Sequence, residues 1–497
     1  MALNKNGKFE IPTAAEILAA MRNDADKEEK KLIQRAYGFA QAAHEGSTRA
    51  SGAPYFQHVA STALNLAEFG LDATTIAAGL LHDVIEDACA DPQEVKKEFG
   101  AEVYFLVDGV TKLGVVKYSG MERHAKSMQK FLLASIHDWR VLVIKIADRL
   151  HNVRTLEFLP EKKAHRIAEE TIEIYAPLAY RMGMGRLVGE LQEASFPFAY
   201  PKEYQEIGEK LKKHVKNTDK YLEKAWKKLK SAMARADLGH AVTQKRVKKL
   251  YSLWKKMQKK KVGIESIYDI IALRVIVETR EECYSVLRIV HEIWKPIPGR
   301  IRDYIALPKT NGYQSIHTTV LTGDGGLVEV QIRTRMMHEY AEYGLAAHSD
   351  YKKSKTASEN TEWLHEIQEL EKHDLDTASF LKSLSADTFS DRIFVFTPTG
   401  DVIDLPIGAT VLDFAYAVHT DIGNHAFGGF VNGKFSALKD ELKNADIVDV
   451  KHDKNKYNPS SKWLNWVRTH IAKREISAYL KKNKKTLWEH IKMRSLF

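Results

Sequence analysis

The sequence predicts a chain of several domains of the α+β class, with an all-α part first and two sheet-bearing parts after it. At 497 residues the chain is long enough for roughly two to four domains. Apolar residues recur at helical spacing through residues 12–196, whereas β-branched runs and short strand patterns begin at residue 268. Apolar residues make up 44% of the chain and charged residues 28%, which is ordinary for a globular protein.

Cysteine usage and the N-terminal sequence predict a cytoplasmic protein. The two cysteines, Cys89 and Cys283, are far apart in sequence, so neither a disulfide scaffold nor a thiolate metal cluster is indicated. The first residues contain no apolar signal core, and no run reaches the roughly 18 apolar residues that a membrane span needs.

The net charge of +10 is concentrated in one block of the chain. Residues 202–261 hold 20 basic and 6 acidic residues, which gives a local net charge of +14. A block of this size suggests partners that carry phosphate, whereas most charge runs are solvated helix faces. Both interpretations stay open for different parts of the block.

Residues 12–196 are predicted to be mostly helical, because apolar residues recur there every three to four positions. Glycines and prolines such as Gly46, Gly70 and Pro92 separate the helices. The expected helices cover residues 14–21, 31–43, 59–69, 74–85, 121–135, 138–158 and 163–179.

One stretch at the end of the helix expected at 74–85 carries candidate chemistry. Its polar residues are His82, Asp83, Glu86 and Asp87. On a helix, residues four apart lie on neighbouring stripes of one face, so this stretch gathers an imidazole and three carboxylates. Three buried carboxylates repel one another unless a cation lies among them. The stretch therefore predicts a metal site, against the alternative of a polar surface pair.

A second group of candidate residues follows a connector. Apolar residues recur at helical spacing through residues 207–233, with lysines on the other face, which predicts one amphipathic helix or a pair of helices. The β-branched run 268–277 predicts a buried strand with Asp269 at its start, where a carboxylate can hold Mg²⁺. Alternation in the strand expected at 328–333 places Glu329, Gln331 and Arg333 on one face.

Cations around two carboxylates suit transfer between nucleotides, because phosphoryl-type transfer depends mainly on positioning and charge stabilisation. Taken singly, about half of such lysines and arginines are surface charges.

The order of these residues resembles a known family. His58, the pair His82-Asp83 and the distant Asp148 resemble the HD superfamily of metal-dependent phosphohydrolases. With the blocks 311–317 and 329–334, the sequence resembles the RelA/SpoT-type family of bifunctional (p)ppGpp synthetase/hydrolases up to about residue 480. The resemblance implies transfer of pyrophosphate from ATP to the 3′-hydroxyl of GDP or GTP, giving AMP and (p)ppGpp. It also implies hydrolysis of (p)ppGpp to GDP or GTP and pyrophosphate, in control of the stringent response.

The resemblance also implies a division into domains. In chain order these are an all-α HD-type hydrolase domain at 1–196, connecting helices at 197–235, a mixed α/β nucleotidyltransferase-like synthetase domain at 236–351, a linker at 352–388, a small β-grasp TGS domain at 389–452 and a basic helical tail at 453–497. Within the synthetase domain, residues 341–351 resemble the family's closing helix.

For the hydrolase, the resemblance implies a Mn²⁺ site, although spacing alone does not distinguish Mn²⁺ from Fe²⁺ or Mg²⁺. The metal would lower the pKa of a bound water. The implied ligands are His58, His82, Asp83 and Asp148. The pair implied to orient and deprotonate the water is Glu86 and Asp87. The residues that resemble nucleotide contacts are Arg49 and Asn152, while His151 is equally well read as a capping or packing residue.

For the synthetase, the resemblance implies a Mg²⁺ site and two nucleotide subsites. Asp269 would bind Mg²⁺, and Glu329 would complete that site and help take the proton from the 3′-hydroxyl. Tyr313 would stack on the guanine. The residues implied to bind ATP are Arg246, Lys248, Lys256 and Arg274. Those implied to position the acceptor are Lys309, Asn311 and His317, beside a basic motif typical of bifunctional members, with Arg300 and with Arg302 where Lys is usual.

The TGS resemblance implies contact with the ribosome and uncharged tRNA, but one motif departs from the family. Relatives usually have Gly-His-Arg-Cys-Ile-Gly where residues 423–428 read Gly-Asn-His-Ala-Phe-Gly, so the tRNA contact does not follow from the motif. Long members continue into further regulatory domains, whereas this sequence ends at Phe497.

Two alternatives to a bifunctional enzyme stay open. One is an enzyme in which one of the two sites has decayed. The other is an RNA- or ribosome-binding regulator, which would show salt-dependent RNA binding after both sites are disabled.

Overall fold

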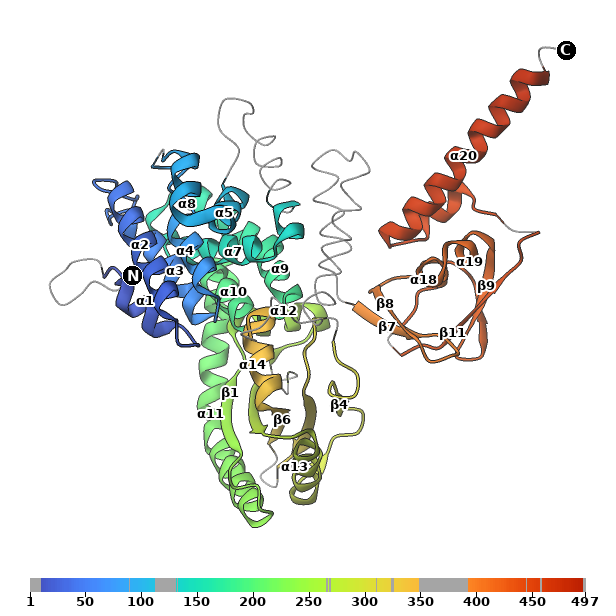
Figure 1. The fold of residues 1–497 in the computed structure, drawn as a ribbon. Coiled ribbons are helices and arrows are strands. Elements are labelled where there is room, and N and C mark those ends of the chain that lie inside the picture. The colour runs from blue at the N-terminus through green and yellow to red at the C-terminus, as the bar shows by residue number, and fades with distance from the viewer. Residues whose placement is uncertain are drawn as a thin grey trace. The chain divides into compact units, whose positions relative to one another are not determined.

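The computed structural model describes residues 10–88, 90–111, 131, 133–264, 267, 270–309, 311–322, 326–347, 392–443, 445–455 and 458–494. The chain forms two compact units, Met1–Thr377 and Ala378–Phe497. Figure 1 shows helices at the start of the first unit, followed by a sheet with its own helices. The multidomain α+β class predicted from the sequence is confirmed.

The first part of unit 1 is helical, and two capping boxes begin it. Thr13 and Asp26 each accept a backbone N–H from the helix that follows, and a glutamate three residues on reaches back to the cap. The helices are α1 (Ala14–Ala20), α2 (Lys27–Ala43), α3 (Phe56–Glu68), α4 (Ala73–Leu81), α5 (Pro92–Val110), α7 (Arg140–Val153), η1 (Leu156–Phe158), α8 (Glu161–Glu170), η2 (Thr171–Tyr175), α9 (Ala176–Arg181) and α10 (Gly185–Ala199).

These bounds confirm the helices expected at 14–21, 31–43 and 59–69. The helix expected at 138–158 ends at Val153, and the one expected at 163–179 contains a π-turn at Thr171–Tyr175. Most of the helix expected at 121–135 lies outside the described residues.

The prediction of a helix through residues 82–87 is wrong. Helix α4 ends at Leu81, and turns follow it to Asp87. The His82 ring donates a hydrogen bond through Nδ1 to the carbonyl of Gly79 at 2.6 Å. In a continuing helix, that carbonyl would accept a backbone N–H instead. One helical bond remains, from the Asp87 N–H to the Asp83 carbonyl at 2.9 Å. Asp83 and Asp87 therefore still lie close together, but not on a regular helix face.

The second part of unit 1 is a mixed sheet reached through one long helix, α11 (Pro201–Arg235), whose side chains at 215–221 are outside the description. The sheet order is β1-β2-β6-β5-β3, and β4 pairs with β5. Strands β2 and β6 are parallel, and the other pairs are antiparallel. The strands are β1 (Val242–Val247), β2 (Ile271–Val277), β3 (Lys295–Pro296), β4 (Arg302–Asp303), β5 (Ile316–Leu321) and β6 (Leu327–Thr334).

The sheet buries one face against helices α11, α12 (Leu250–Lys260) and α13 (Arg280–Ile293). Alternate residues of the central strands, such as Leu273, Val275 and Val330, join this core. The other face carries the polar alternates, in the phase that the sequence predicted for Glu329, Gln331 and Arg333.

Helix α14 (Arg335–Tyr343) follows β6 and contacts both β6 and β2. Of the closing helix expected at 341–351, residues 341–343 belong to α14, residues 344–347 form the 3₁₀ helix η4 (Gly344–Ala347), and residues 348–351 lie outside the described residues. Helix α14 ends where Gly344 has φ of 59°, and a Cβ on Gly344 would collide with the carbonyl of Met182.

Unit 2 holds two small sheets. Strands β7 (Arg392–Phe396) and β8 (Val402–Pro406) form one, and β9 (Ala426–Val431), β10 (Lys434–Ser436) and β11 (Val448–His452) form the other. Asn432 and Gly433, both at positive φ, make the predicted hairpin turn. The helical elements are α18 (Val411–Val418), α19 (Thr420–His425), η6 (Ser461–Asn465) and α20 (His470–Arg494).

The start of α20 is fixed to the sheets' core by the buried Asp413. Its carboxylate accepts backbone N–H groups from Arg468 and Thr469, while Ala472 and Ile476 pack into the core. The linker expected at 352–388 lies outside the described residues.

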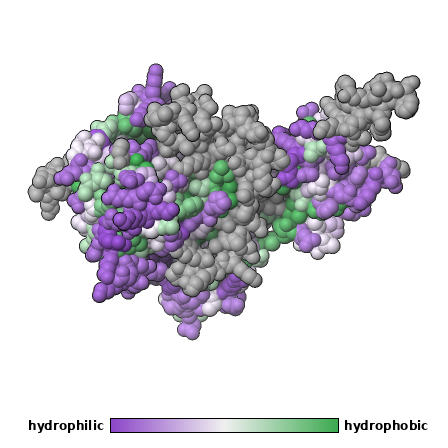
Figure 2. Space-filling model, turned by 45° about the horizontal axis from the view of Figure 1, so that its top comes forward, coloured by the Kyte–Doolittle hydropathy of each residue, from purple (hydrophilic) through white to green (hydrophobic). Residues whose placement is uncertain are grey.

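The surface drawn in Figure 2 is mixed, with hydrophobic areas among hydrophilic ones. Among the described helices, none combines the length and the apolar character required to cross a membrane.

Candidate functional sites

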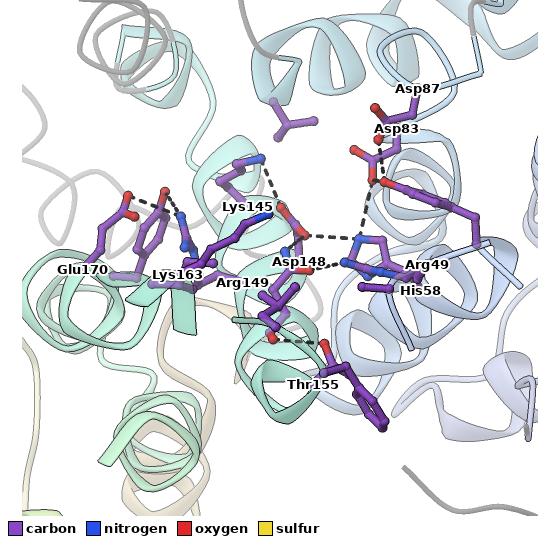
Figure 3. Close-up of a pocket in the computed structure, with 18 of the residues that line it drawn as sticks. Arg49, His58, Asp83, Asp87, Lys145, Asp148, Arg149, Thr155, Lys163 and Glu170 are labelled. Carbon is purple, nitrogen blue, oxygen red and sulfur yellow. Dashed lines mark hydrogen bonds and ion pairs between the residues drawn. The ribbon is translucent and has the colours of Figure 1, made fainter. Parts of the chain in front are cut away.

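A cavity of about 520 Å³ lies in the helical part of unit 1. Its floor comes from α3 and α7, which bring His58 and Asp148 together, and from the turn after α4, which brings Asp83. Figure 3 shows Asp148 between Lys145 and His58, with Asp83 and Asp87 on the far side of His58. The cavity thus gathers residues that are far apart in sequence, from Arg49 to Tyr175.

Three of the four predicted metal ligands offer donor atoms within 4.8 Å of one another: His58, His82 and Asp148. The Nε2 atom of His58 lies 3.2 Å from Asp148 Oδ1 and 3.5 Å from Asp83 Oδ2. The Nε2 atom of His82 lies 3.2 Å from Asp83 Oδ2. All four side chains are buried.

The histidine rings are oriented as metal-ligand rings are. His82 uses Nδ1 to bond the Gly79 carbonyl, which fixes the tautomer with the lone pair on Nε2. That Nε2 is buried, and within the described part of the chain it has no hydrogen-bond partner. His58 contacts the His151 ring, Nδ1 to Nδ1, at 2.9 Å. A buried lone pair facing a carboxylate and a second imidazole fits a divalent cation.

The carboxylates of this cluster are held in the charged state. Burial alone would raise the pKa of Asp148, but Lys145, 3.0 Å away, and His58 hold that pKa well below its usual range. The pKa of Asp83 is likewise held low against burial by the two histidines. Burial, with His58 and Arg49, lowers the pKa of His151, so its ring is neutral. Burial would lower the pKa of His82, but Asp83 and Asp148 raise it, so a bound cation would compete with a proton for this ring.

At the mouth of the cavity the predicted nucleotide contacts meet. The Arg49 guanidinium donates to Asn152 Oδ1 at 2.6 Å, and Asn152 donates to Asp148 Oδ1 at 2.6 Å. The Tyr55 hydroxyl bonds both Asp83, at 2.9 Å, and Asp87. Asp87 lines the cavity, whereas Glu86 is not among its lining residues.

Sequence reasoning missed several residues of this cavity. Lys145 precedes the predicted ligand Asp148 by three residues on α7, a helical spacing that could have revealed it. Arg149 follows Asp148 directly. Arg149 donates to Glu170 at 3.3 Å and to the Tyr175 hydroxyl at 3.0 Å. Tyr55 precedes His58 by three residues, and His151, left undecided from the sequence, contacts the predicted ligand His58 directly.

The second candidate site is the polar face of the sheet in unit 1, here called the charged face. It carries Arg246 on β1, Arg274 on β2, His317 on β5, and Glu329, Gln331 and Arg333 on β6. Strand register sets these residues opposite or diagonal to one another, as Arg274 is to Gln331 and His317 is to Gln331. The face therefore brings together arginines from three strands, β1, β2 and β6.

Glu329 lies at the centre of a hydrogen-bonded series. His317 Nδ1 is 2.8 Å from Glu329 Oε1, and His317 Nε2 is 2.9 Å from the Tyr313 hydroxyl. Gln331 donates to the same Glu329 oxygen at 3.2 Å and accepts from Arg246 at 3.2 Å. The ammonium of Lys309 lies 5.0 Å from the centre of the Tyr313 ring. The predicted base Glu329, the predicted acceptor contact His317 and the predicted stacking residue Tyr313 are thus neighbours.

The remaining predicted residues lie at the edges of this site. Asn311 donates to the Tyr180 carbonyl of α9 at 3.1 Å. The guanidinium of Arg302 donates to the carbonyls of Gly299 and Ile301, both at 3.1 Å. Lys248 precedes α12, Lys256 lies on it, and Arg300 is exposed in the turn before β4. Asp269, the predicted Mg²⁺ ligand, lies outside the described residues.

Three known domain families match successive parts of the chain. An HD domain matches residues 36–185, the region found in RelA / SpoT proteins matches residues 245–356, and a TGS domain matches residues 393–451.

Curated relatives extend the similarity over nearly the whole chain. A guanosine-3′,5′-bis(diphosphate) 3′-pyrophosphohydrolase of Aquifex aeolicus is 42% identical over 91% of this chain and 65% of its own length. The bifunctional (p)ppGpp synthase/hydrolase SpoT of Escherichia coli is 42% identical over 92% of this chain and 65% of its own. The pyrophosphohydrolase of Borreliella burgdorferi is 38% identical over 93% and 70%.

The chain spans about three fifths to two thirds of the length of most curated relatives it matches. The Borreliella burgdorferi relative is 38% identical and is matched over 70% of its length, and three domain families match this chain. Together these similarities support a single family assignment. The chain belongs to the RelA/SpoT family.

Proposed function

We propose that the chain is a bifunctional alarmone enzyme that makes (p)ppGpp on the charged face and hydrolyses it in the helical cavity. The observation that carries the proposal is the lone pair of His82 Nε2, buried without a hydrogen bond among His58, Asp83 and Asp148. A second, separate set of cations around Glu329 supports the opposite activity. The names of the curated relatives cover both activities.

In hydrolysis, water attacks the phosphorus next to the 3′-oxygen of (p)ppGpp and the bond from that phosphorus to the 3′-oxygen breaks. The 3′-oxygen takes up a proton as GDP or GTP departs, and the diphosphoryl group with its new oxygen is released as pyrophosphate. A divalent cation, for which we propose Mn²⁺, would be held by His58, His82, Asp83 and Asp148 and would lower the pKa of the attacking water. Asp87 orients the water and takes its proton, and the Tyr55 hydroxyl fixes that carboxylate. Arg49 and Asn152 hold the nucleotide at the cavity mouth.

In synthesis, the 3′-oxygen of GDP or GTP attacks the β-phosphorus of ATP, and AMP leaves. Glu329 takes the proton of the 3′-hydroxyl, and His317 holds the carboxylate in place at 2.8 Å. Tyr313 stacks on the guanine, and Lys309 and Asn311 position the acceptor. Arg246 and Arg274 clasp the adenine and the phosphates of ATP. Lys248 and Lys256 also meet the phosphates, where fixed cations stabilise the charge of the transferring group.

We further propose that the synthetase uses one Mg²⁺, held by Asp269 and Glu329, because Arg300 and Arg302 supply fixed cations beside β4. Titration of free Mg²⁺ at fixed ATP should then saturate once ATP is complexed. A second-order rise far above the ATP concentration would exclude the one-metal proposal.

The proposal is tested by incubating the chain with ATP and GDP in the presence of Mg²⁺, and separately with ppGpp and Mn²⁺, and separating the nucleotides. The expected products are ppGpp with AMP in the first reaction, and GDP with pyrophosphate in the second. If either reaction yields no product, the corresponding site has lost its activity and the bifunctional assignment is wrong.

For unit 2 we propose contact with RNA, with uncharged tRNA on the ribosome as the family-based candidate. On its three-stranded sheet, the exposed rings of Phe430 and Phe435 meet edge to face at 5.8 Å, with the Lys451 ammonium 5.6 Å from the Phe430 ring. Aromatic rings beside a cation suit stacking of unpaired bases. The variant Phe430→Ala should lose salt-dependent tRNA binding; unchanged binding would remove this face from consideration.

A further inference from the structure

Helix α12 begins without a capping side chain of its own. Its N-cap residue is Lys249, whose side chain makes no capping bond, because an ammonium group can only donate. The first turn of α12 contains no acidic residue either. The first N–H groups of a helix have no partner within the helix and carry partial positive charge, so this end of α12 needs an acceptor from another element.

That acceptor is Glu193, which lies on α10 in the helical part of unit 1. Its Oε1 atom accepts the backbone N–H of Tyr251 at 2.9 Å, and its Oε2 atom accepts the backbone N–H of Leu250 at 3.2 Å. One carboxylate therefore caps two successive N–H groups that are 57 and 58 residues away in sequence. Its negative charge at the positive end of α12 adds a favourable interaction.

The residues of α10 on either side of Glu193 also fit α12. Four residues before it, Gly189 is buried, and a Cβ there would collide with the side chain of Lys249. Three residues after it, the ring of Phe196 meets the ring of Tyr251 edge to face at 5.5 Å. The cap thus lies between two close contacts that fix the start of α12 against α10.

The segment that Glu193 caps carries two of the cations proposed for ATP. Lys248 directly precedes the N-cap residue, and Lys256 lies on α12 itself. The N–H of Lys248 donates to the carbonyl of Ile270 at 2.8 Å, which ties the chain before α12 to the residue before β2. With that end held by the sheet, the cap determines how α12 leaves it and where Lys256 lies relative to Lys248.

We propose that Glu193 is a positioning residue of the synthetase, which caps α12 from α10 and so holds Lys248 and Lys256 in place for the phosphates of ATP. This inference rests on the proposed synthetase function. Glu193 acts through the backbone of α12 and not through contact with a nucleotide. Its loss frays the first turn of α12 and weakens ATP binding, whereas the acceptor subsite around Tyr313 and the helical cavity keep their residues.

The test measures ATP binding and both reactions for Glu193→Ala. The Kd for ATP with Mg²⁺, titrated calorimetrically without an acceptor, and the KM for ATP should each rise roughly three- to tenfold, as expected for the loss of a helix cap. The KM for GDP and the hydrolysis of ppGpp should stay within about twofold of the wild-type values. Glu193→Gln keeps one accepting oxygen and should lie between the wild-type chain and Glu193→Ala.

A cap supplied by α12 itself should replace Glu193. Lys249→Ser places a hydroxyl at the N-cap, where serine accepts an N–H of the first turn. In the Lys249→Ser chain, Glu193→Ala should therefore change the Kd for ATP by less than about twofold. Glu206→Ala is the matched control, because Glu206 lies on the next helix, α11, with Lys210 at 3.9 Å, and it should change none of these values.

Unchanged ATP binding by Glu193→Ala would overturn the proposal. An equal rise in the KM for GDP, a loss of hydrolysis, or a defect that Lys249→Ser does not reduce would also overturn it, because a general loosening of unit 1 predicts these results. If the wild-type chain binds ATP but makes no (p)ppGpp, the proposed function fails, and the ATP titration still decides the role of Glu193. A wild-type chain that does not bind ATP contradicts both.

Discussion

The two candidate sites of unit 1 carry opposite surplus charge. In the helical cavity, Asp83 and Asp148 face His58 and His82, and the Lys145 ammonium lies 3.0 Å from Asp148. On the charged face, Arg274 and Arg333 share the single carboxylate of Glu342. The first arrangement is completed by a cation and the second by an anion.

The comparison teaches that an unbalanced buried cluster indicates the charge of its ligand. Buried ionic groups are stable when they are paired and hydrogen-bonded, so a persistent excess shows where a partner belongs. In the cavity the unused atom is a lone pair, His82 Nε2; on the charged face the unused atoms are N–H donors, the Nε atoms of two arginines. A buried acceptor atom without a hydrogen bond thus indicates a metal site, and buried donor atoms without hydrogen bonds indicate a phosphate site.

The largest expected effect separates the two sites completely. His82→Ala should reduce hydrolysis of ppGpp by a factor of about 10³ or more, because it removes a metal ligand, while synthesis stays within about twofold. Product formation in both directions is measured on the same preparation. Substantial hydrolysis by this variant would break the assignment of the cavity.

The converse change should separate the sites in the other direction. Glu329→Gln removes the proton acceptor but keeps the contact with His317, so synthesis should fall by about 10² to 10⁴ with hydrolysis unaffected. Asp269→Ala should behave in the same way. If synthesis by Glu329→Gln persists at the wild-type rate, the base lies elsewhere on the face.

A smaller effect is expected for the acceptor subsite. Tyr313→Ala should raise the KM for GDP with little change in the KM for ATP, since stacking on a base contributes about 1–3 kcal/mol. Tyr313→Phe keeps the ring and loses only the bond to His317, so it should retain most of the affinity for GDP. Equal losses in both variants would exclude stacking as the role of Tyr313.

The smallest effect concerns the stability of the charged face. Burial, with repulsion by Arg333 and Arg274, lowers the pKa of His338 from 6.5 to about 4. The unfolded chain binds a proton there below pH 6.5 while the native chain does not, so stability falls as pH decreases from 6.5 toward 4. Denaturation at pH 7 and pH 5.5 should show a loss of roughly 1 kcal/mol from this residue, absent in His338→Gln. An identical loss in the variant would contradict the pKa shift.

Much of the fold follows from periodicity, and its failures have local causes. Helical spacing located α1 to α3, and alternation placed Glu329, Gln331 and Arg333 on one face. The helix through residues 82–87 failed because the His82 ring competes with the backbone for one carbonyl. Spacing cannot reveal a competition between a side chain and the backbone.

The candidate sites divide in the same way. His58, His82 and Asp148 could be predicted as candidate metal ligands because residue type and order carry the signal, and the structure brings their donor atoms together. The contact of Glu342 with Arg274 was missed because it depends on the packing of α14 against β2. Such a tertiary contact leaves no local pattern in the sequence. A single sequence does not show which residues contact a neighbouring helix or strand.

The account is tested most directly by titrating the nucleotide-free chain with Mn²⁺ and counting bound ions by electron paramagnetic resonance or calorimetry. Surplus negative charge in the cavity alone predicts one tight site, which is lost in His82→Ala and retained in Glu329→Gln and Arg274→Gln. Retention of the tight site in His82→Ala, or its loss in Glu329→Gln, would contradict the assignment of a cation site to the helical cavity.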